Sequence, residues 1–233
     1  MIPVSTNRDL RQIEQHGSSC FPLSVCLAHL SDYEGGRFPT HWHDDFEFLL
    51  VLSGQMLCTA NGESTILAAG DAVFINSGAL HTAEAAGGRD CAYYAVTVHP
   101  DFFGLPGTTL VATYVSPFCD SPFFNLCKIS ADSPDGLLLL NALRTVCGLY
   151  GVQDPSRTID IHIQVLTLWK SLFLLCRDFF SFDFCSSESQ RLHALVSYIK
   201  KNYNQPITLD QIAAAAGISK SGCSHLFKQY MKE

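Results

Sequence analysis

Short apolar segments separated by turn sequences fill the chain between Phe21 and His99. Each segment has the length of a β-strand, and glycine-containing turns such as EGG, NGE and AGD stand between them. The dipeptide Asn61-Gly62 is typical of a tight hairpin, because both residues tolerate a positive φ. Such closely spaced strands predict an all-β barrel or sandwich. The predicted strands are VCLAHL, FEFLLVL, QMLCTA, STILAA, DAVFI and CAYYAVTV.

The pattern becomes helical after Pro100 and a proline-rich stretch. Residues 136–150 repeat apolar side chains at helical spacing, and a longer helix is predicted from Arg157. This longer helix has two apolar sides, and both must be covered. One side can be covered either by a neighbouring helix or by a second subunit. A homodimer is therefore expected as one of these two alternatives. The stripes are Ile159, Ile163, Leu166, Trp169 and Phe173, and Ile161, Val165, Leu168, Leu172 and Leu175.

The charge is unevenly distributed along the chain. The formal net charge of −7 argues by itself against nucleic acid as a partner. From Glu188 onward, however, six basic side chains stand against three acidic ones, whereas the preceding residues carry nine basic and nineteen acidic ones. A basic C-terminal segment on an acidic body suggests two separate tasks. Residues 183–189 (DFCSSES) are small and polar, and are predicted to link the two.

The positions of the cysteines and the hydropathy of the chain indicate the cellular compartment of the protein. The ten cysteines form no CxxC pair, and they are scattered among apolar residues, as expected of buried thiols in a reducing cytoplasm. The opening residues are polar and unlike a signal peptide. The run from Thr158 to Phe180 contains several charged residues, and is therefore predicted not to span a membrane. We expect a cytoplasmic protein.

The stretch HWHDDFEFLLVL places polar groups at the start of an apolar strand. If the strand includes all of it, His41, His43 and Glu47 point to one face. The other face then carries side chains that are expected to point into apolar packing, namely Trp42, Phe46, Phe48 and Leu50. A neutral polar group that is buried without a partner costs about 2–7 kcal/mol. A cation, an ordered water cluster or a polar ligand would relieve that cost. His81 follows a strand and a glycine turn, as expected of a residue that enters the same pocket.

The glycine and histidine spacings in this region resemble both cupin motifs. The first is matched at Gly35, His41, His43, Glu47 and Gly54, and the second at Gly70, Gly78 and His81. The second motif departs from the family at Asn76, where proline is usual, and at Ala85, where asparagine is usual. The resemblance covers residues 21–100. It implies a small β-barrel in which the three histidines and the glutamate are metal ligands.

Three imidazoles and a carboxylate suit Fe, Mn, Ni or Zn. An octahedral ion would keep two open positions, whereas a tetrahedral zinc would be saturated. Cupin-like barrels with this pattern also bind an organic effector or nothing, so a metal site and an effector pocket remain alternatives. The remaining histidines have no ligand spacing and are expected to be surface or structural residues: His16, His29, His99, His162 and His193. Asp44 and Asp45 are expected to be a solvated pair or a pair at the rim of the site.

The last residues fit the template of a helix-turn-helix. Thr208 and Ser219 are predicted to cap two short helices, and Gly217 supplies the positive φ of the turn. Ala213 is the small residue at the helix crossing, with apolar contacts from Ile212, Ala216, Ile218, Cys223 and Leu226. The outward face of the last helix carries Lys220, Ser221, Ser224, His225 and Lys228. A purely structural three-helix subdomain with solvated lysines is the alternative.

The segments ITLDQIAAAAGIS and HLFKQYMKE resemble the first helix-turn-helix of the AraC/XylS transcription regulators. The resemblance implies an effector-sensing barrel, dimerising helices and two helix-turn-helix units that bind DNA. The chain stops at Glu233, where that family continues into a second unit. It is therefore expected to be truncated after the first one.

Together these features predict an α+β protein, not an enzyme, that senses a small molecule and binds DNA. The expected parts are a cupin-like barrel (1–130), a helical dimerisation and linker region (131–185) and a helix-turn-helix subdomain (186–233). Lys220, Ser224 and His225 are predicted to contact base edges, and Ser221 and Lys228 to contact phosphates. The rival interpretation is a metal-dependent cupin enzyme, a dioxygenase or isomerase.

Overall fold

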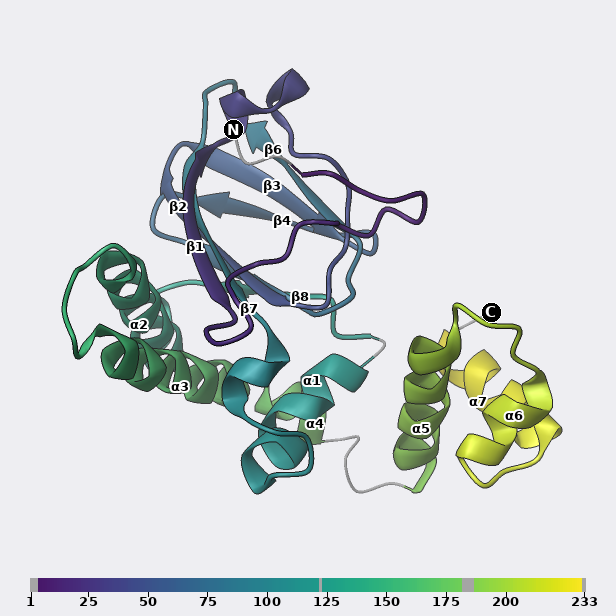
Figure 1. Cartoon of the computed structure of the whole chain (residues 1–233). Coiled ribbons are helices and arrows are strands. Elements are labelled where there is room, and N and C mark those ends of the chain that lie inside the picture. The colour runs from purple at the N-terminus through teal and green to yellow at the C-terminus, as the bar shows by residue number, and fades with distance from the viewer. Residues whose placement is uncertain (1–3, 122, 182–186, 232–233) are drawn as a thin grey trace. The chain divides into compact units, whose positions relative to one another are not determined.

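The computed structural model describes residues 4–121, 123–181 and 187–231 (Figure 1). The chain divides into two compact units. Unit 1 comprises the described residues of 1–119 and 124–175, and unit 2 those of 120–123 and 176–233. The α+β class is confirmed, because strands dominate the first part of the chain and helices the rest.

Unit 1 contains two antiparallel sheets, with strand orders β1-β7-β2-β5-β8 and β4-β3-β6. All six predicted strands are confirmed with small shifts at their ends. β6 and β8 were not predicted. Half of β6 is alanine and Thr82 is its one β-branched residue, so it has little of the composition typical of strands, and β8 lies in the proline-rich stretch. The strands are β1 Leu23–His29, β2 Phe46–Ser53, β3 Gln55–Ala60, β4 Glu63–Ala68, β5 Ala72–Ile75, β6 His81–Ala86, β7 Ala92–Val98 and β8 Leu126–Ile129.

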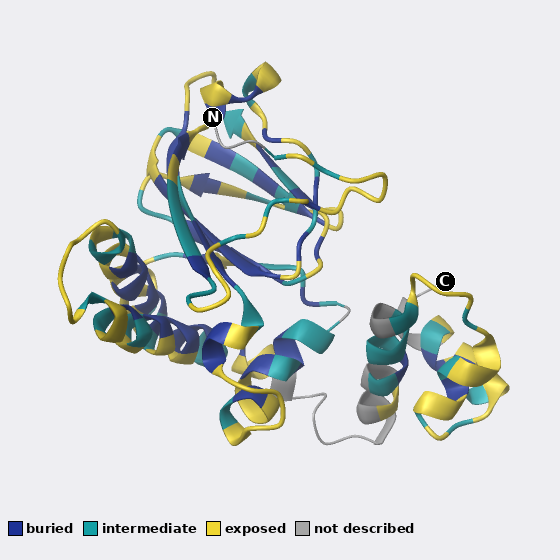
Figure 2. Ribbon diagram, in the orientation of Figure 1, coloured by how far each residue is buried: buried dark blue, intermediate teal, exposed yellow. Residues whose placement is uncertain are grey.

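The two sheets face each other across an apolar core, and we call them together the barrel. Buried side chains of both sheets meet in this core, among them Leu49, Val73 and Tyr93 from the larger sheet and Met56 and Leu67 from the smaller one. These side chains are buried, and Figure 2 shows buried positions in dark blue along the strands. Isolated bridges at Arg37–Glu84 and His41–His81 join the segment before β2 to β6. The histidines therefore lie where the two sheets are joined.

Helices cover the outer face of the larger sheet. Phe46 and Phe74 point outward from it, and Phe46 packs on Trp169 of α3 with ring centroids 4.6 Å apart. α2 begins with Pro134 behind Ser133, whose hydroxyl accepts from the amide of Gly136. The helices of unit 1 are α1 Ser116–Asp120, α2 Pro134–Tyr150 and α3 Arg157–Leu175, with short turns at Leu30–Asp32, Glu34–Gly36, Pro100–Phe103 and Val111–Val115.

The two predicted stripes of α3 differ in burial. Ile161, Val165, Leu168 and Leu172 are buried, and α3 packs along α2. On the other stripe Ile159, Ile163 and Leu166 are 64%, 53% and 43% exposed, whereas Trp169 is buried. Among the described residues, α3 is also the one helix whose length and composition would allow it to cross a membrane, which by itself is weak support for such a role.

Unit 2 contains a three-helix core. Ala213 of α6 lies against Leu195, Cys223 and Leu226, as the helix-turn-helix template predicts. Gly217 has a φ of +64°, which confirms the predicted turn residue. The predicted linker is only partly described: 183–186 lie outside the described residues, and α5 already begins at Ser187. The helices are α4 Arg177–Ser181, α5 Ser187–Asn202, α6 Leu209–Ala215 and α7 Lys220–Met231.

Both predicted caps of the helix-turn-helix are present. The Thr208 hydroxyl accepts from the amide of Gln211, and the Gln211 side chain accepts from the amide of Thr208, which is a complete capping box. The Ser219 hydroxyl accepts from the amide of Gly222. The caps fix where α6 and α7 begin, and thereby which residues of α7 are at the surface.

Candidate functional site

The candidate site lies at the junction between the two sheets. His41 and His81 exchange both backbone hydrogen bonds, at 3.0 and 2.8 Å. The sequence argument that placed both early histidines on β2 is wrong, because β2 begins only at Phe46 and the chain bends at 44–45. His41 and His43 belong to the irregular segment before the strand. Their convergence is therefore due to the bridge with β6 and not to strand alternation.

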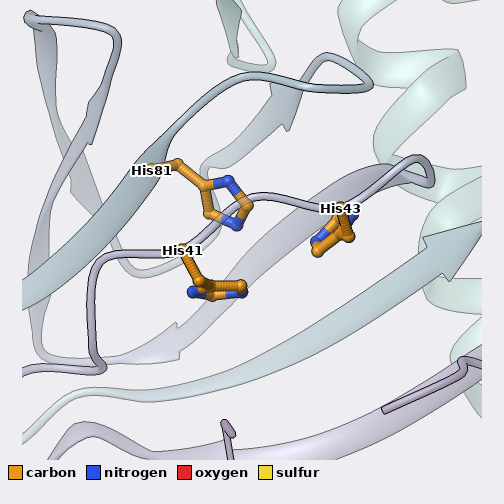
Figure 3. A group of neighbouring side chains, drawn as sticks. All are labelled: His41, His43 and His81. Carbon is orange, nitrogen blue, oxygen red and sulfur yellow. The ribbon is translucent and has the colours of Figure 1, made fainter. Parts of the chain in front are cut away.

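The structure brings the four predicted residues together. The ring centroids of His41 and His81 are 4.4 Å apart, and those of His43 and His81 are 5.0 Å apart (Figure 3). One nitrogen from each of the three rings lies within 4.8 Å of the others. The Oε2 atom of Glu47 lies 2.9 Å from His81 Nε2 and 3.4 Å from His43 Nε2. All four side chains are buried.

Each imidazole is held by a backbone carbonyl. The Nδ1 atoms of His41, His43 and His81 lie 2.8, 3.1 and 2.8 Å from the carbonyl oxygens of residues 39, 45 and 79. A carbonyl oxygen only accepts, so each Nδ1 must carry the hydrogen. In a neutral ring the Nε2 lone pair is then free. Metal-binding histidines commonly have this arrangement, because the carbonyl fixes both the tautomer and the ring orientation.

The surroundings of the cluster favour a neutral His41 and an ionised Glu47. Burial lowers the pKa of His41 to about 3, and the neighbouring His81 adds to this effect. Burial raises the pKa of Glu47, but the contacts with His43 and His81 outweigh it and hold that pKa well below its usual range. His43 Nε2, His81 Nε2 and Glu47 Oε2 are buried without a hydrogen-bond partner. Protons on the rings, or one cation bound by all of them, would satisfy these atoms.

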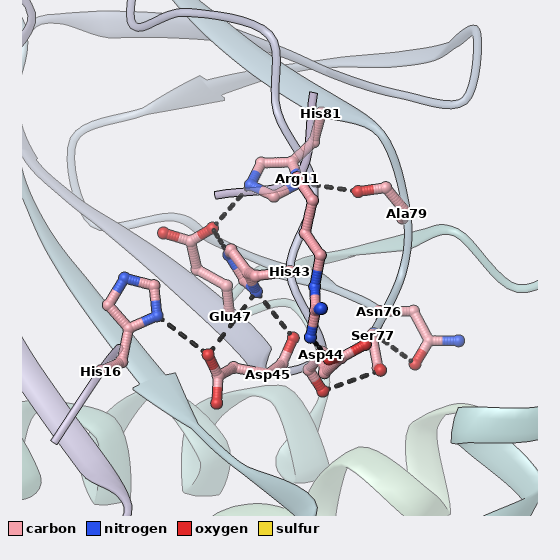
Figure 4. A network of polar contacts seen from close by, with 10 residues as sticks. All are labelled: Arg11, His16, His43, Asp44, Asp45, Glu47, Asn76, Ser77, Ala79 and His81. Atoms are coloured by element: carbon pink, nitrogen blue, oxygen red, sulfur yellow. Dashed lines mark hydrogen bonds and ion pairs between the residues drawn. The ribbon is translucent and has the colours of Figure 1, made fainter. Parts of the chain in front are cut away.

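Asp45 and His16 form a second layer behind His43, which sequence reasoning missed. Asp45 is buried and not solvated, so of the two predicted alternatives only a position at the rim of the site remains. Its Oδ2 lies 2.9 Å from His16 Nδ1 and 3.9 Å from His43 Nδ1 (Figure 4). The rings of His16 and His43 meet edge to face at 5.1 Å. Burial lowers the pKa of His16, but the contact with Asp45 outweighs it and raises that pKa.

The N-terminal segment is tied to the residue between the two early histidines. Gln12 N donates to the carbonyl of Trp42, and Trp42 N donates to the carbonyl of Leu10. The Trp42 indole donates to the carbonyl of Asp9 and lies under the guanidinium of Arg11 at 5.4 Å. The prediction that Trp42 points into apolar packing is therefore wrong. Its side chain holds the first residues of the chain against the site.

The departure from the second cupin motif has a structural explanation. Asn76 is buried, and its side-chain amide donates to the carbonyls of Phe118 and Phe124, both at 2.7 Å. Its Oδ1 accepts from the amide of Ser77 at 2.9 Å. Proline could make none of these side-chain hydrogen bonds. Asn76 thus ties the turn before His81 to the segment that leads into β8.

Two hollows lie beside the cluster. A cavity of about 70 Å³ inside the barrel is lined by Gln12, Tyr33, His41, Glu47, Tyr93 and Thr97, among others. A more polar groove of about 550 Å³ lies along the N-terminal segment and includes His43 and Asp45. Gln12 and His16 line both hollows. The groove is within the usual size range of ligand pockets, about 300–1,000 Å³, and the inner cavity is far below it.

The predicted DNA-contacting residues all lie on α7. Lys220, Ser221, Ser224, His225 and Lys228 are exposed. Lys220 Nζ lies 2.7 Å from Asp210 Oδ2 of α6, and both side chains are more than half exposed. An exposed ion pair of this kind contributes at most about 1 kcal/mol. A phosphate or base could therefore replace Asp210 as the partner of Lys220.

Comparison with known proteins finds similarity to a ligand-binding domain family and to transcription regulators. Residues 25–110 match the family described as the AraC-like ligand binding domain. The chain is 29% identical to the uncharacterized HTH-type transcriptional regulator YdeC of Bacillus subtilis, over 97% of this chain and 77% of that protein. It is 20% identical to the uncharacterized HTH-type transcriptional regulator YbfI of the same organism, over 84% of this chain and 66% of that protein.

A solved structure has a related fold. ToxT from Vibrio cholerae O395 superposes with a TM-score of 0.52 at 9% identity, covering 88% of this chain and 74% of that one. The order of a strand-rich unit followed by helices is thus shared at the level of fold. The expected resemblance to AraC-type regulators is confirmed by these comparisons.

Proposed function

We propose that this chain, whose residues 25–110 match the AraC-like ligand binding domain family, is an effector-responsive regulator of transcription. A small molecule would bind in the barrel and alter DNA binding by the helix-turn-helix. The observation that carries the proposal is the combination, in one chain, of a hollow barrel with a capped helix-turn-helix whose α7 presents polar and basic side chains. The effector must bind one arrangement of the protein more tightly than another, because otherwise it shifts no equilibrium.

Lys220, Ser224 and His225 contact base edges in this proposal, and Ser221 and Lys228 contact phosphates. Their exposure along α7, the second helix of the motif, supports this assignment. The local excess of basic residues from Glu188 onward supports it too, because phosphate contacts supply much of the affinity for DNA.

Substitution of Lys228 tests the DNA-binding assignment. DNA fragments are first selected from a genomic library by binding to the purified chain. Lys228→Ala is then expected to weaken binding to all selected fragments to a similar extent, and to lower the slope of log affinity against log salt concentration by about 1. Lys170→Ala, which removes an exposed lysine of α3 in unit 1, is the matched control and should change neither quantity. Equal behaviour of the two variants would contradict the assignment.

The partners of the regulator are DNA, the effector and a second copy of the chain. The exposed stripe of Ile159, Ile163 and Leu166 on α3 supports a homodimer, because isologous contacts between apolar helix faces are a common solution for such stripes. A partner such as DNA implies a cytoplasmic location, which stays a prediction.

A metal fits the buried cluster. His41, His43, His81 and Glu47 would hold a divalent transition metal such as Fe, Mn, Ni or Zn, because the three rings converge, Glu47 Oε2 lies against two of them, and three of these donor atoms have no hydrogen-bond partner. When bound, the ion would supply positive charge and Lewis acidity at the end of the cavity. The carbonyls behind each Nδ1 orient the rings, and Asp45 with His16 positions His43 from the far side.

A cupin enzyme, a dioxygenase or isomerase, is the second candidate, and the intact set of buried ligands favours it. Metal analysis of the purified protein, followed by turnover assays with phenols and sugars under oxygen, separates the two. Stoichiometric metal with turnover supports the enzyme. Effector binding without turnover supports the regulator.

A further inference from the structure

Two buried polar atoms face the inner cavity without a partner. Thr97 of β7 and Gln12 of the N-terminal segment are 5% and 9% exposed, and both line the cavity. Thr97 Oγ1 and Gln12 Oε1 have no hydrogen-bond partner. Leaving a buried hydroxyl or amide oxygen unpaired costs about 1–3 kcal/mol each. Two such atoms in one cavity indicate a site built for a ligand with hydrogen-bonding groups.

The strand register explains why this end of the barrel is polar. Thr97 is directly opposite Ser24 of β1 and Glu47 of β2. Residues directly opposite in antiparallel strands point to the same face, so these three side chains form one polar row across the sheet. The next inward row, containing Ala95 and Leu49, is apolar and packs in the barrel core. The polar row thus lies at the end of the barrel where the histidine cluster is.

The size of the cavity limits what can bind. A cavity of about 70 Å³ is roughly half of the ~150 Å³ that accommodates a benzene molecule, with six non-hydrogen atoms. A water molecule needs about 10–15 Å³ on the same measure. The cavity therefore suits a molecule of roughly three to six non-hydrogen atoms. A pentose, a hexose or a fatty acid cannot be enclosed in it.

The lining also limits the charge of the ligand. The Glu47 carboxyl lines the cavity, and no lysine or arginine does among the residues that the structure describes. In the metal-free protein, a free carboxylate or phosphate would therefore find no basic side chain in this lining to pair with, and burying an unpaired charge is costly. Gln12 Oε1 can only accept a hydrogen bond, so the ligand must donate one to it. The hydroxyl of Thr97 requires a second hydrogen-bonding group.

We propose that the inner cavity of the barrel binds a compact neutral molecule with two hydroxyl groups, such as a diol of two or three carbons. One hydroxyl donates to Gln12 Oε1 and the other pairs with Thr97 Oγ1. This inference rests on the proposed function, because it names the chemical class of the effector. Gln12 and His16 line both the cavity and the outer groove, so the ligand enters along the N-terminal segment.

Calorimetric titration of the full chain with propane-1,2-diol tests the proposal. Propan-1-ol, which lacks one hydroxyl, should bind at least tenfold more weakly, because it leaves one buried polar atom unpaired. Lactate, which has the same carbon skeleton but a carboxylate, should bind more weakly still. Tighter binding of lactate or of a fatty acid than of the diol would overturn the proposal.

Two variants locate the site. Thr97→Val keeps the shape of the side chain and removes the hydroxyl, and Gln12→Met removes the acceptor at similar length. Each is expected to weaken binding of the diol at least tenfold. Thr65→Val, on β4 outside the cavity lining, is the matched control and should leave binding unchanged. Diol binding that is equal in all these variants would place the ligand elsewhere and overturn the proposal.

The failure of this inference is distinguishable from that of the proposed function. DNA binding is measured without ligand, through the salt dependence described for Lys228→Ala. Retained DNA binding without any binding of the diol removes the inference alone. Binding of the diol by a chain that does not bind DNA removes the proposed function and leaves the cavity assignment standing.

Discussion

At the scale of single residues, the tautomer of the histidine cluster has a measurable consequence. Because each Nδ1 is occupied by a carbonyl, the Nε2 atoms of His41, His43 and His81 are already oriented to bind a cation. Mn²⁺, Ni²⁺ or Zn²⁺ at 100 times its dissociation constant should raise the free energy of unfolding by about 2.7 kcal/mol, because a ligand that binds only the folded state stabilises it. Thermal melts with and without metal measure this effect.

His81→Gln should abolish the metal-dependent rise, because it removes the most buried ligand. His29→Gln alters an exposed histidine that pairs with Asp90, and should retain the full rise. A metal-dependent shift of the same size in the His81→Gln protein would show that the ion binds at another place.

Thr97 offers a prediction on stability. Its hydroxyl is buried without a partner, so Thr97→Val exchanges an unsatisfied polar group for an apolar one of the same shape. We expect the free energy of unfolding of the ligand-free protein to rise by about 1 kcal/mol. Urea denaturation of both proteins measures the difference. A decrease of similar size would mean that the hydroxyl is paired in the native protein.

Spacing along the chain was enough to predict the four central residues of the site but not their surroundings. The cupin-like order found His41, His43, Glu47 and His81. His16 is 29 residues from Asp45 in the sequence, and local sequence patterns do not predict contacts between residues so far apart in the chain. The strand-alternation argument reached the correct convergence for a wrong reason, because it extended β2 back through residues that bend.

At the scale of elements, the cap of α6 determines the start of the helix-turn-helix. α6 has only seven residues, so a single lost cap is a large part of its local stability. Thr208→Ala should lower that stability by about 1 kcal/mol. Hydrogen exchange of the α6 amides measures it, and Thr208→Ser, which keeps the hydroxyl, should behave like the original protein. Unchanged exchange in Thr208→Ala would contradict the role of the cap.

Element types were predictable where periodicity or caps were strong. α3 and α6 follow clear patterns of apolar residues and capping groups, and both are present. β6 was not predictable, because alanine-rich strands have no local signature and this one is specified by pairing with β3. The proposed boundaries of the three sequence parts stay predictions.

At the scale of the whole molecule, the exposed apolar stripe of α3 leads us to expect that two copies of the chain associate. We expect the protein to be dimeric at micromolar concentration, and Ile163→Glu to make it monomeric by placing a charge in the apolar contact. Sedimentation velocity measures both states. Lys170→Glu changes an exposed polar position of the same helix and should leave the dimer intact. A monomeric original protein, or a dimeric Ile163→Glu protein, would contradict this use of the stripe.

The division of the barrel into a polar and an apolar end has an evolutionary consequence. The core residues Leu49 and Val73, which do not line the cavity, are separate from the row of Ser24, Thr97 and Glu47 that faces it. Mutations that change which compound is recognised can therefore accumulate in that row with little loss of folding. Descendants of one such ancestor could diverge to answer different chemical signals while keeping the same scaffold.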